Sequence, residues 1–563
     1  MLVGLTAGLA AVILKLLVHF IRGLITHDYH IAHQYIFYLL FPVIGIALSV
    51  LFVKKVLGGK LGRGTSNILY AIAKKGARLP PDQMYSHIVT SALTVGFGGS
   101  AGLESPIVTT GSAIGSNYGR TYKLTYKDRT LLLACGAAAG IGASFNAPIA
   151  GLLFALEVLL ADVTISAFIP IMIAAAAGGL LSKVVLNEDI LLSFKLKQAF
   201  DYHNVPWYIV LGLLAGFVSV YYTRVFPKVE SFFHRRKKHT WANVFIGGSL
   251  LAVLIWLFPS LFGEGYDSIK TLADSHPGDL MTNSPFSVYS TNTLFILVFF
   301  FVIIFVKAIA AGLTIGIGGN GGNFAPSLFV GGYLGFVFAY GLNLAGFQLP
   351  AANFTIVAMA GVLSGIFHAP LTGMFLIAEI TGGYELMIPL MIVSALSYTV
   401  VKYFEPYSMD TKKLAAKGHI FTHDKDRNIL TVLKVSKIVE TGFQPVRPEM
   451  KLGDLVDVVA HSQRNVFPVV NKEKELVGII LLESIREIMF KRELYNTVTV
   501  DQLMRPPAAI VQPDEDMYAV MKKFDETGAW NLPVVENGLY IGFVSKSSIF
   551  TSYRKRLIRS TAE

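Results

Sequence analysis

Long apolar segments recur through the larger part of this chain, and they constrain its fold more than any other feature. Several approach the roughly 20 residues that an α-helix needs to cross the hydrocarbon core of a bilayer. Of the 563 residues, 53% are hydrophobic and 15% are charged, whereas about a quarter of a soluble protein is charged. Examples are LVGLTAGLAAVILKLLVHFI, YIVLGLLAGFVSVYY, LFILVFFFVIIFVKAIAAGLTIGIG and MIPLMIVSALSYTVV. The sequence therefore predicts a polytopic integral membrane protein in a lipid bilayer.

Basic residues cluster between the apolar segments, although the formal net charge of the whole chain is +11. The clusters are Lys54, Lys55, Lys60 and Arg63; residues 234–239; and Lys402, Lys412, Lys413 and Lys417. Because positively charged loops stay on the cytoplasmic side, we expect these loops and the C-terminal tail to be cytoplasmic, with the protein in the plasma (inner) membrane. No basic helix with interleaved aromatic residues occurs, which excludes nucleic acid as a partner.

The N-terminus and the cysteine content argue against three further features. The chain is apolar from Leu2 and lacks a small-residue cleavage pattern, so we expect no cleavable signal peptide. The single cysteine, Cys135, excludes an intrachain disulfide and a metal site built from several cysteines. We expect it to be a small buried hydrophobic residue.

The composition changes near residue 409, after which the chain reads as short strands and charged helices. Within this tail NVFPVVNKEKELVGIILLESI is similar to WNLPVVENGLYIGFVSKSSI, which aligns Pro468 with Pro533. The repeat resembles a pair of CBS modules, which normally pack together as one α/β unit. The predicted boundaries are a membrane domain at 1–408, a linker at 409–434, and CBS modules at 435–495 and 500–558.

The membrane part is repeated as well. SFNAPIAGLLFALE is similar to IFHAPLTGMFLIAE, which aligns Glu157 with Glu379. GLESPIVTTGSAIG aligns with GNFAPSLFVGGYLG, so that Gly102 matches Gly322 and Glu104 falls opposite Phe324. Duplicated membrane halves with glycine- and proline-broken segments at matching places point to a substrate site at the repeat interface, near the midplane.

The breaks indicate the sign of the substrate's charge. A glycine run that leads into a helix leaves free backbone N–H groups at the positive end of the helix dipole, which is a ready anion site. Two such starts, at 102–106 and 322–326, face each other in this prediction, and GRGTSNILYAI offers a third. The carboxylate of Glu104 is itself an anion and would occupy the site of a mobile anion, so its protonation or displacement would open the path. Glu157 and Glu379 are expected to pair with helix ends.

These motifs, in this order, resemble the CLC family of chloride channels and transporters. The resemblance implies an all-α, two-repeat membrane domain of tilted and re-entrant helices followed by the tandem CBS domain, in a homodimer with one pore per subunit. It makes Glu104 in GLESP the gating glutamate. It places the anion against residues of the GLESP and GNFAP motifs and a late tyrosine: Gly102, Leu103, Ser105, Asn323, Phe324 and Tyr407.

Two positions depart from the family pattern. Where the family usually has serine in its first motif, this chain has Arg63 in GRGTS. Either this arginine lines the anion path, or it turns toward cytoplasmic water while Thr65, Ser66 or backbone N–H groups contact the anion. Family exchangers have a proton-carrying glutamate directly after the position of Glu157, where this chain has Val158. We therefore expect selective, channel-like or weakly proton-coupled movement of chloride or a similar anion, with an H+/Cl- antiporter as the main alternative.

Other readings of the motifs are weaker. GGSAG together with His368 matches an intramembrane serine protease, but Asn320 replaces the serine in the repeated copy, so we expect no enzyme and no catalytic residues. We do not favour a CBS-regulated cation transporter, because the predicted helix starts attract anions rather than cations. His27, His30 and His33 are expected to lie in an interfacial loop, and no metal is predicted. Ser484 and Ser548 stand where nucleotide-binding CBS modules commonly have a ribose-binding aspartate, so we expect no cofactor and doubt nucleotide binding.

Overall fold

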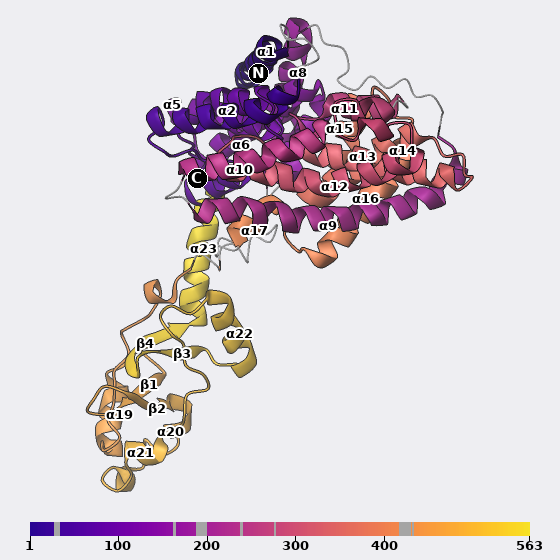
Figure 1. Ribbon diagram of the computed structural model, residues 1–563. Coiled ribbons are helices and arrows are strands. Elements are labelled where there is room, and N and C mark those ends of the chain that lie inside the picture. Colours follow the sequence, from indigo (N-terminus) through magenta and orange to yellow (C-terminus); the bar gives the residue numbers. More distant parts are fainter. Residues whose placement is uncertain are drawn as a thin grey trace. The chain divides into compact units, whose positions relative to one another are not determined.

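A computed structural model describes residues 1–26, 34–160, 165–186, 200–236, 240–274, 277–415, 430 and 433–562. The chain divides into two compact units, Met1–Gly418 and His419–Glu563, coloured from indigo to orange and from orange to yellow in Figure 1. His27, His30 and His33, and most of the predicted linker at 409–434, lie outside the described residues.

The regular elements among the described residues of the first unit are helices, as the all-α prediction requires. Seven of its described helical segments are long and apolar enough to cross a membrane. Its α-helices are α1 (Leu2–Thr26), α2 (Gln34–Lys55), α3 (Thr65–Lys74), α4 (Gln83–Gly96), α5 (Glu104–Thr121), α6 (Tyr126–Phe145), α7 (Pro148–Phe154), α8 (Ile165–Leu186), α9 (Val205–Arg235), α10 (Thr240–Leu257), α11 (Tyr266–Ala273), α12 (Thr293–Gly316), α13 (Phe324–Leu344), α14 (Ala351–Phe367), α15 (Pro370–Ile380), α16 (Met387–Phe404) and α17 (Met409–Ala415). Between α7 and α8 lies a π-helical turn, η2 (Ala155–Leu159).

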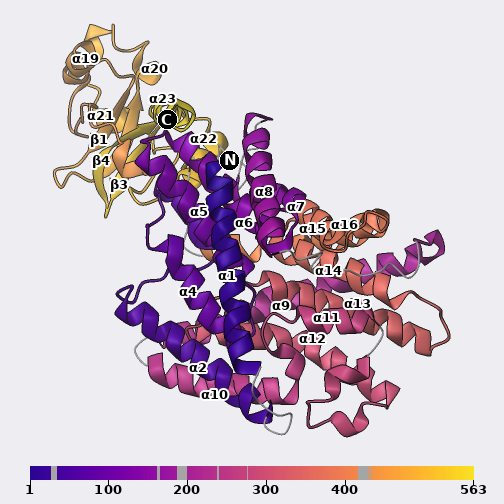
Figure 2. The same ribbon diagram turned by 90° about the horizontal axis from the view of Figure 1, so that it is seen from above.

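The duplication seen in the sequence is present in the structure. Helices α5, α6 and α7 of the first half correspond to α13, α14 and α15 of the second, and Figures 1 and 2 show both sets inside one helical unit. The ends of α6 and α14 are alike: Asn146 and His368 both take a left-handed conformation, with φ of 53° and 56°, which stops a helix. Pro148 and Pro370 then start the next helices, a position where proline loses no hydrogen bond.

Reciprocal hydrogen bonds join the two halves. The Leu371 and Thr372 N–H groups at the start of α15 donate to Glu157, at 3.0 and 2.7 Å. In the other direction, the Ile149 and Ala150 N–H groups at the start of α7 donate to Glu379, at 3.0 and 2.8 Å. Each glutamate therefore caps a helix of the opposite half, which confirms the expectation that both pair with helix ends.

Glycines allow the helices of each half to pack with their backbones almost in contact. A Cβ atom added at Gly111 of α5 would lie 2.1 Å from the Gly136 carbonyl of α6, and one added at Gly136 would lie 1.9 Å from the Gly111 carbonyl. In the second half, a Cβ atom at Gly335 of α13 would lie 2.1 Å from the Phe354 carbonyl of α14. Small residues at such crossings are typical of membrane helix packing.

The second unit contains two similar β-hairpins with helices around them. Its strands are β1 (Val466–Val470), β2 (Leu476–Leu481), β3 (Asn531–Glu536) and β4 (Leu539–Ser545); its α-helices include α19 (Leu452–Ala460), α20 (Leu482–Ile485), α21 (Val500–Leu503), α22 (Met517–Thr527) and α23 (Lys546–Ala562). β1 pairs with β2 and β3 with β4, both antiparallel, and the register shifts at the equivalent places Val469/Val470 and Val534/Val535. The predicted α/β repeat is confirmed.

Candidate functional site

The starts of α5 and α13 are held side by side. The Gly102 N–H donates to the Gly322 carbonyl at 2.9 Å, and the Gly322 N–H donates to the Gly102 carbonyl at 2.7 Å. A second reciprocal pair supports this bridge: the Thr314 hydroxyl accepts from the Ser100 N–H, and the Thr94 hydroxyl accepts from the Asn320 N–H, at 3.2 and 3.0 Å. The two glycine-rich breaks thus form one locally symmetric element.

Glu104 is the first residue of α5 and is 2% exposed. The Tyr266 hydroxyl donates to its Oε1 at 2.6 Å. Its Oε2 lies against Gly102, where an added Cβ atom would be 2.1 Å from this oxygen and 3.0 Å from the Ala325 nitrogen of α13. The carboxylate therefore sits beside the starts of both helices, where backbone N–H groups and the helix dipoles favour an anion.

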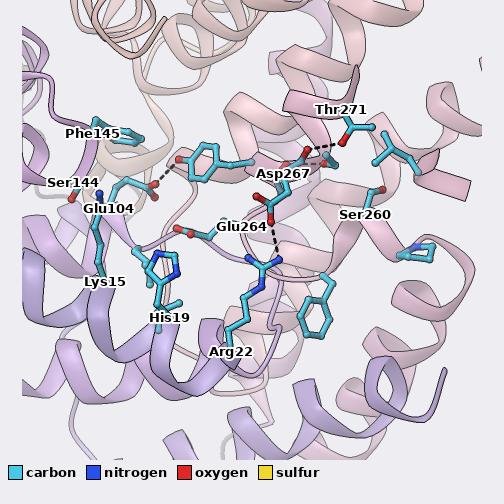
Figure 3. Close-up of a pocket in the computed structure, with 18 of the residues that line it drawn as sticks. Lys15, His19, Arg22, Glu104, Ser144, Phe145, Ser260, Glu264, Asp267 and Thr271 are labelled. Atoms are coloured by element: carbon cyan, nitrogen blue, oxygen red, sulfur yellow. Dashed lines mark hydrogen bonds and ion pairs between the residues drawn. The ribbon is translucent and has the colours of Figure 1, made fainter. Parts of the chain in front are cut away.

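Two cavities meet at this carboxylate. The larger, the Glu264 cavity, has a volume of about 530 Å³ and is lined by Glu104, Leu103 and Ile107 together with residues of α1 and α11. The smaller, the Arg63 cavity, measures about 50 Å³ and is lined by Glu104, Ser105, Val108 and residues of α3, α9 and α13. Figure 3 shows Glu104 at the edge of the larger cavity. Residues at the start of α5 line both spaces, and Glu104 is common to the two.

Arg63 lines the smaller cavity and also caps a helix. Its two terminal nitrogens donate to the Ile315 and Gly318 carbonyls at the end of α12, at 3.1 and 2.8 Å. The Ser66 hydroxyl donates to the Asp410 carbonyl at 2.9 Å. The arginine is therefore fixed at the wall of the cavity, while Ser66 is engaged with α17.

Asn323 and Phe324 lie at the wall of the smaller cavity, whereas Tyr407 lies outside both linings. The Asn323 side chain accepts from the buried Tyr222 hydroxyl at 3.1 Å and, with Phe324, lines the Arg63 cavity. The Phe324 ring packs against Phe367 with ring centroids 4.8 Å apart. Tyr407 is half-buried between α16 and α17, and it is not among the residues that line either cavity. Its role as an anion contact remains a prediction.

Val158 lies in the π-helical turn η2 and is half-buried. Its neighbour Glu157 points to the start of α15. Two other carboxylates, Glu230 of α9 and Asp410 of α17, line the Arg63 cavity. Acidic groups are thus available on this side of Glu104, although the position after Glu157 has none.

Sequence reasoning missed Tyr266 and Glu264, which line the Glu264 cavity. The segment GEGYDS, which contains Glu264 and Tyr266, repeats the pattern of GRGTSN around Arg63. That similarity could have identified the two residues, because α11 has the same position in the second half as α3 has in the first. Lys307 is fully buried in α12, and its Nζ donates to the Ser100 hydroxyl at 2.9 Å.

Comparison with known proteins identifies two matching family models and a solved structure with a similar fold. The family model described as voltage gated chloride channel matches residues 45–402, and the CBS domain model matches residues 435–491 and 500–555. A solved structure described as a slow cyanobacterial Cl-/H+ antiporter aligns with a TM-score of 0.62 at 23% identity, covering 74% of this chain and 96% of that one. This likeness shows the fold.

Two relatives carry contrasting names. An H(+)/Cl(-) exchange transporter of Vibrio cholerae is 29% identical over 313 residues, which cover 53% of this chain and 62% of the relative. A chloride channel protein of Arabidopsis thaliana is 26% identical over 428 residues, which cover 69% of this chain and 57% of the relative. The chain thus spans less than two thirds of the length of each.

Proposed function

This chain belongs to the voltage-gated chloride channel family and ends in two CBS domains, and on that premise we propose that it moves chloride through a path gated by Glu104. The observation that carries the proposal is that one buried carboxylate lines both cavities. An anion passing from one cavity to the other has to replace this carboxylate at the starts of α5 and α13. Transport, rather than an enzymatic reaction, is the activity that such a site supports.

The gate opens in this proposal when the carboxylate leaves the helix starts. Protonation removes the charge that competes with chloride, and the vacated N–H groups then receive the mobile anion. Arg63 adds a fixed positive charge at the wall of the smaller cavity, which attracts anions to the approach. Flux should therefore rise as the pH falls.

Weak coupling to protons is our preferred form of this function. Strict exchange requires a proton carrier that reaches Glu104 from the Arg63 cavity, and the position after Glu157 holds Val158, which carries no proton. A specific observation favours stoichiometric exchange as the second candidate: Glu230 and Asp410 line the Arg63 cavity. The exchange activity in the Vibrio relative's name supports the same alternative.

The decisive experiment is flux from proteoliposomes with chloride and pH recorded together. We expect Glu104→Gln to retain chloride flux and to lose its pH dependence, because the amide mimics the protonated gate. Asp128→Asn is the control, since Asp128 is exposed at the start of α6. A wild-type pH profile in Glu104→Gln would reject the gate. If a chloride gradient drives protons uphill at a fixed ratio, the second candidate replaces the first.

We further propose a homodimer in the plasma (inner) membrane with the CBS unit on the cytoplasmic side, based on the resemblance and the basic loops. We propose that this unit works without a bound nucleotide. Ser484 donates its hydroxyl to the Leu481 carbonyl at 2.7 Å, and Ser548 donates its own to the Ser545 carbonyl at 3.0 Å. Both serines are thus engaged locally.

A further inference from the structure

A second carboxylate stands beside Glu104 in the larger cavity. Glu264 lies in the loop before α11, and it lines the same cavity as Leu103 and Glu104 at the start of α5. Both glutamates line the Glu264 cavity and appear together in Figure 3. The cavity wall beside the start of α5 therefore carries two acidic side chains.

The surroundings of Glu264 contain charges of both signs. From α1, Lys15, His19 and Arg22 line the cavity, and Arg22 forms an ion pair with Asp267 of α11 at 2.8 Å. The Lys307 Nζ of α12 donates to the Gly263 carbonyl, one residue before Glu264, at 3.4 Å. The remaining ionisable groups of the lining are Tyr266, whose hydroxyl is bonded to Glu104, and Asp279. Asp267 is thus paired with a cation at the rim, whereas Glu264 lies against the gate.

We infer that Glu264 is the residue through which Glu104 exchanges its proton with the solution that fills the Glu264 cavity. This inference rests on the proposed function, because it assigns the proton source of the same gate. Two negative charges at one helix start repel each other, so a proton shared between two neighbouring carboxylates is favoured. A cavity of about 530 Å³ has room for several water molecules.

A hydronium ion in the cavity protonates the Glu264 carboxylate and leaves water. The O–H bond of the Glu264 carboxyl then breaks as a cavity water takes that proton, and the same water gives one of its own protons to Glu104. Glu264 returns to its charged form and Glu104 becomes neutral, which releases it from the helix starts. The reverse order closes the gate.

The test uses the full chain in proteoliposomes and two readouts of chloride flux. One is the pH midpoint of steady flux, and the other is the rate at which flux changes after a rapid pH jump. We expect Glu264→Gln to keep wild-type flux at acid pH, to move the midpoint to lower pH, and to slow the response at least tenfold. The midpoint moves because a neutral neighbour no longer disfavours the charged form of Glu104. Glu264→Asp should restore most of the response.

Matched variants separate this inference from the proposed function. Asp267→Asn removes the same charge from the same cavity and should change the response rate less than twofold. Glu104→Gln should lose pH dependence altogether; if it keeps the wild-type profile, the gate itself is rejected. If Glu104→Gln behaves as expected while Glu264→Gln matches wild type in both readouts, only the role of Glu264 is overturned. Loss of flux at every pH in both Glu264 variants would likewise overturn it and make the residue structural.

Discussion

The two halves of the membrane unit share a scaffold and differ in chemistry. At the scaffold positions the residues are the same: Glu157 and Glu379 cap equivalent helices of the opposite half. At the positions that line the cavities they differ: Glu104 stands opposite Phe324, and Arg63 stands opposite Glu264. Residues that hold the halves together are therefore repeated, whereas residues that meet the substrate have diverged, and the path is chemically different on its two sides.

The buried polar pairs are an exception to this division, because here residues that join the two halves differ in chemistry. In the second half Lys307 bonds to Ser100 at 2.9 Å. At the equivalent place in the first half, the His87 Nδ1 lies 3.0 Å from the Asn320 side-chain nitrogen. Both pairs join one half to the other, so the cross-link is retained while its chemistry changes from a lysine and a hydroxyl to an imidazole and an amide.

The largest effect should come from the backbone crossing inside one half. Gly136→Ala places a Cβ atom 1.9 Å from the Gly111 carbonyl, and two packed backbones have no flexible side chain to give way. We expect more than about 3 kcal/mol of destabilisation and loss of folded protein, measured by the yield of monodisperse protein in detergent. Gly23→Ala is the control, because an added Cβ atom there meets nothing within 4 Å. Normal yield of Gly136→Ala would contradict this packing.

The equivalence of the scaffold positions can be tested directly. Glu157→Ala and Glu379→Ala each leave the first N–H groups of one helix without a charged acceptor, and hydrogen bonds to charged groups contribute about 1.5–3 kcal/mol each. We expect both variants to lower the thermal unfolding midpoint by similar amounts, with Glu157→Ala slightly worse because the Thr372 hydroxyl also donates to Glu157. A large loss in one variant and none in the other would show that only one cap stabilises the fold.

The divergent positions predict a functional effect that flux per folded protein isolates, because Arg63 also donates to two carbonyls at the end of α12. Arg63→Gln removes a positive charge from the wall of the smaller cavity, and we expect chloride flux at low chloride concentration to fall severalfold while saturating flux changes less. Lys60→Gln is the control, because Lys60 is exposed just before α3. Unchanged concentration dependence in Arg63→Gln would show that its charge acts only on the α12 carbonyls.

The smallest expected effect lies in the CBS unit. Burial raises the pKa of Glu440, but hydrogen bonds from Ser545 and Arg464 outweigh burial and hold the pKa below its usual value. The contacts of Glu440 with Ser545 and Arg464 therefore stabilise the CBS unit above about pH 4.3. Their contribution is lost as the pH falls through the lower pKa that Glu440 has in the folded state. We expect at most about 1 kcal/mol, since Arg464 is 39% exposed. Urea unfolding of Glu440→Gln and wild type at pH 7 and pH 3 should differ only at pH 7.

Much of this arrangement could be predicted from residue patterns. The repeats predicted the matching of α5 with α13, and the glycine-rich breaks predicted helix starts beside Glu104. The pairing of the two glutamates with helix ends was predicted, but the particular donors were not, because the Leu371 and Thr372 N–H groups reach Glu157 only after helices distant in the chain have packed. Tyr266 and Glu264 were missed because their motif shares only glycines with GRGTS, and short glycine patterns specify backbone shape rather than chemistry.

The reciprocal caps between the halves have a consequence for biosynthesis. Ile149 is capped by a residue 230 positions later in the chain, and a ribosome adds about 5–20 residues per second. For roughly 10–50 s, therefore, α7 exists without the carboxylate that completes it. The first half therefore waits in the bilayer as an unfinished intermediate, and chain termination between the halves leaves a fragment whose α7 start lacks its acceptor.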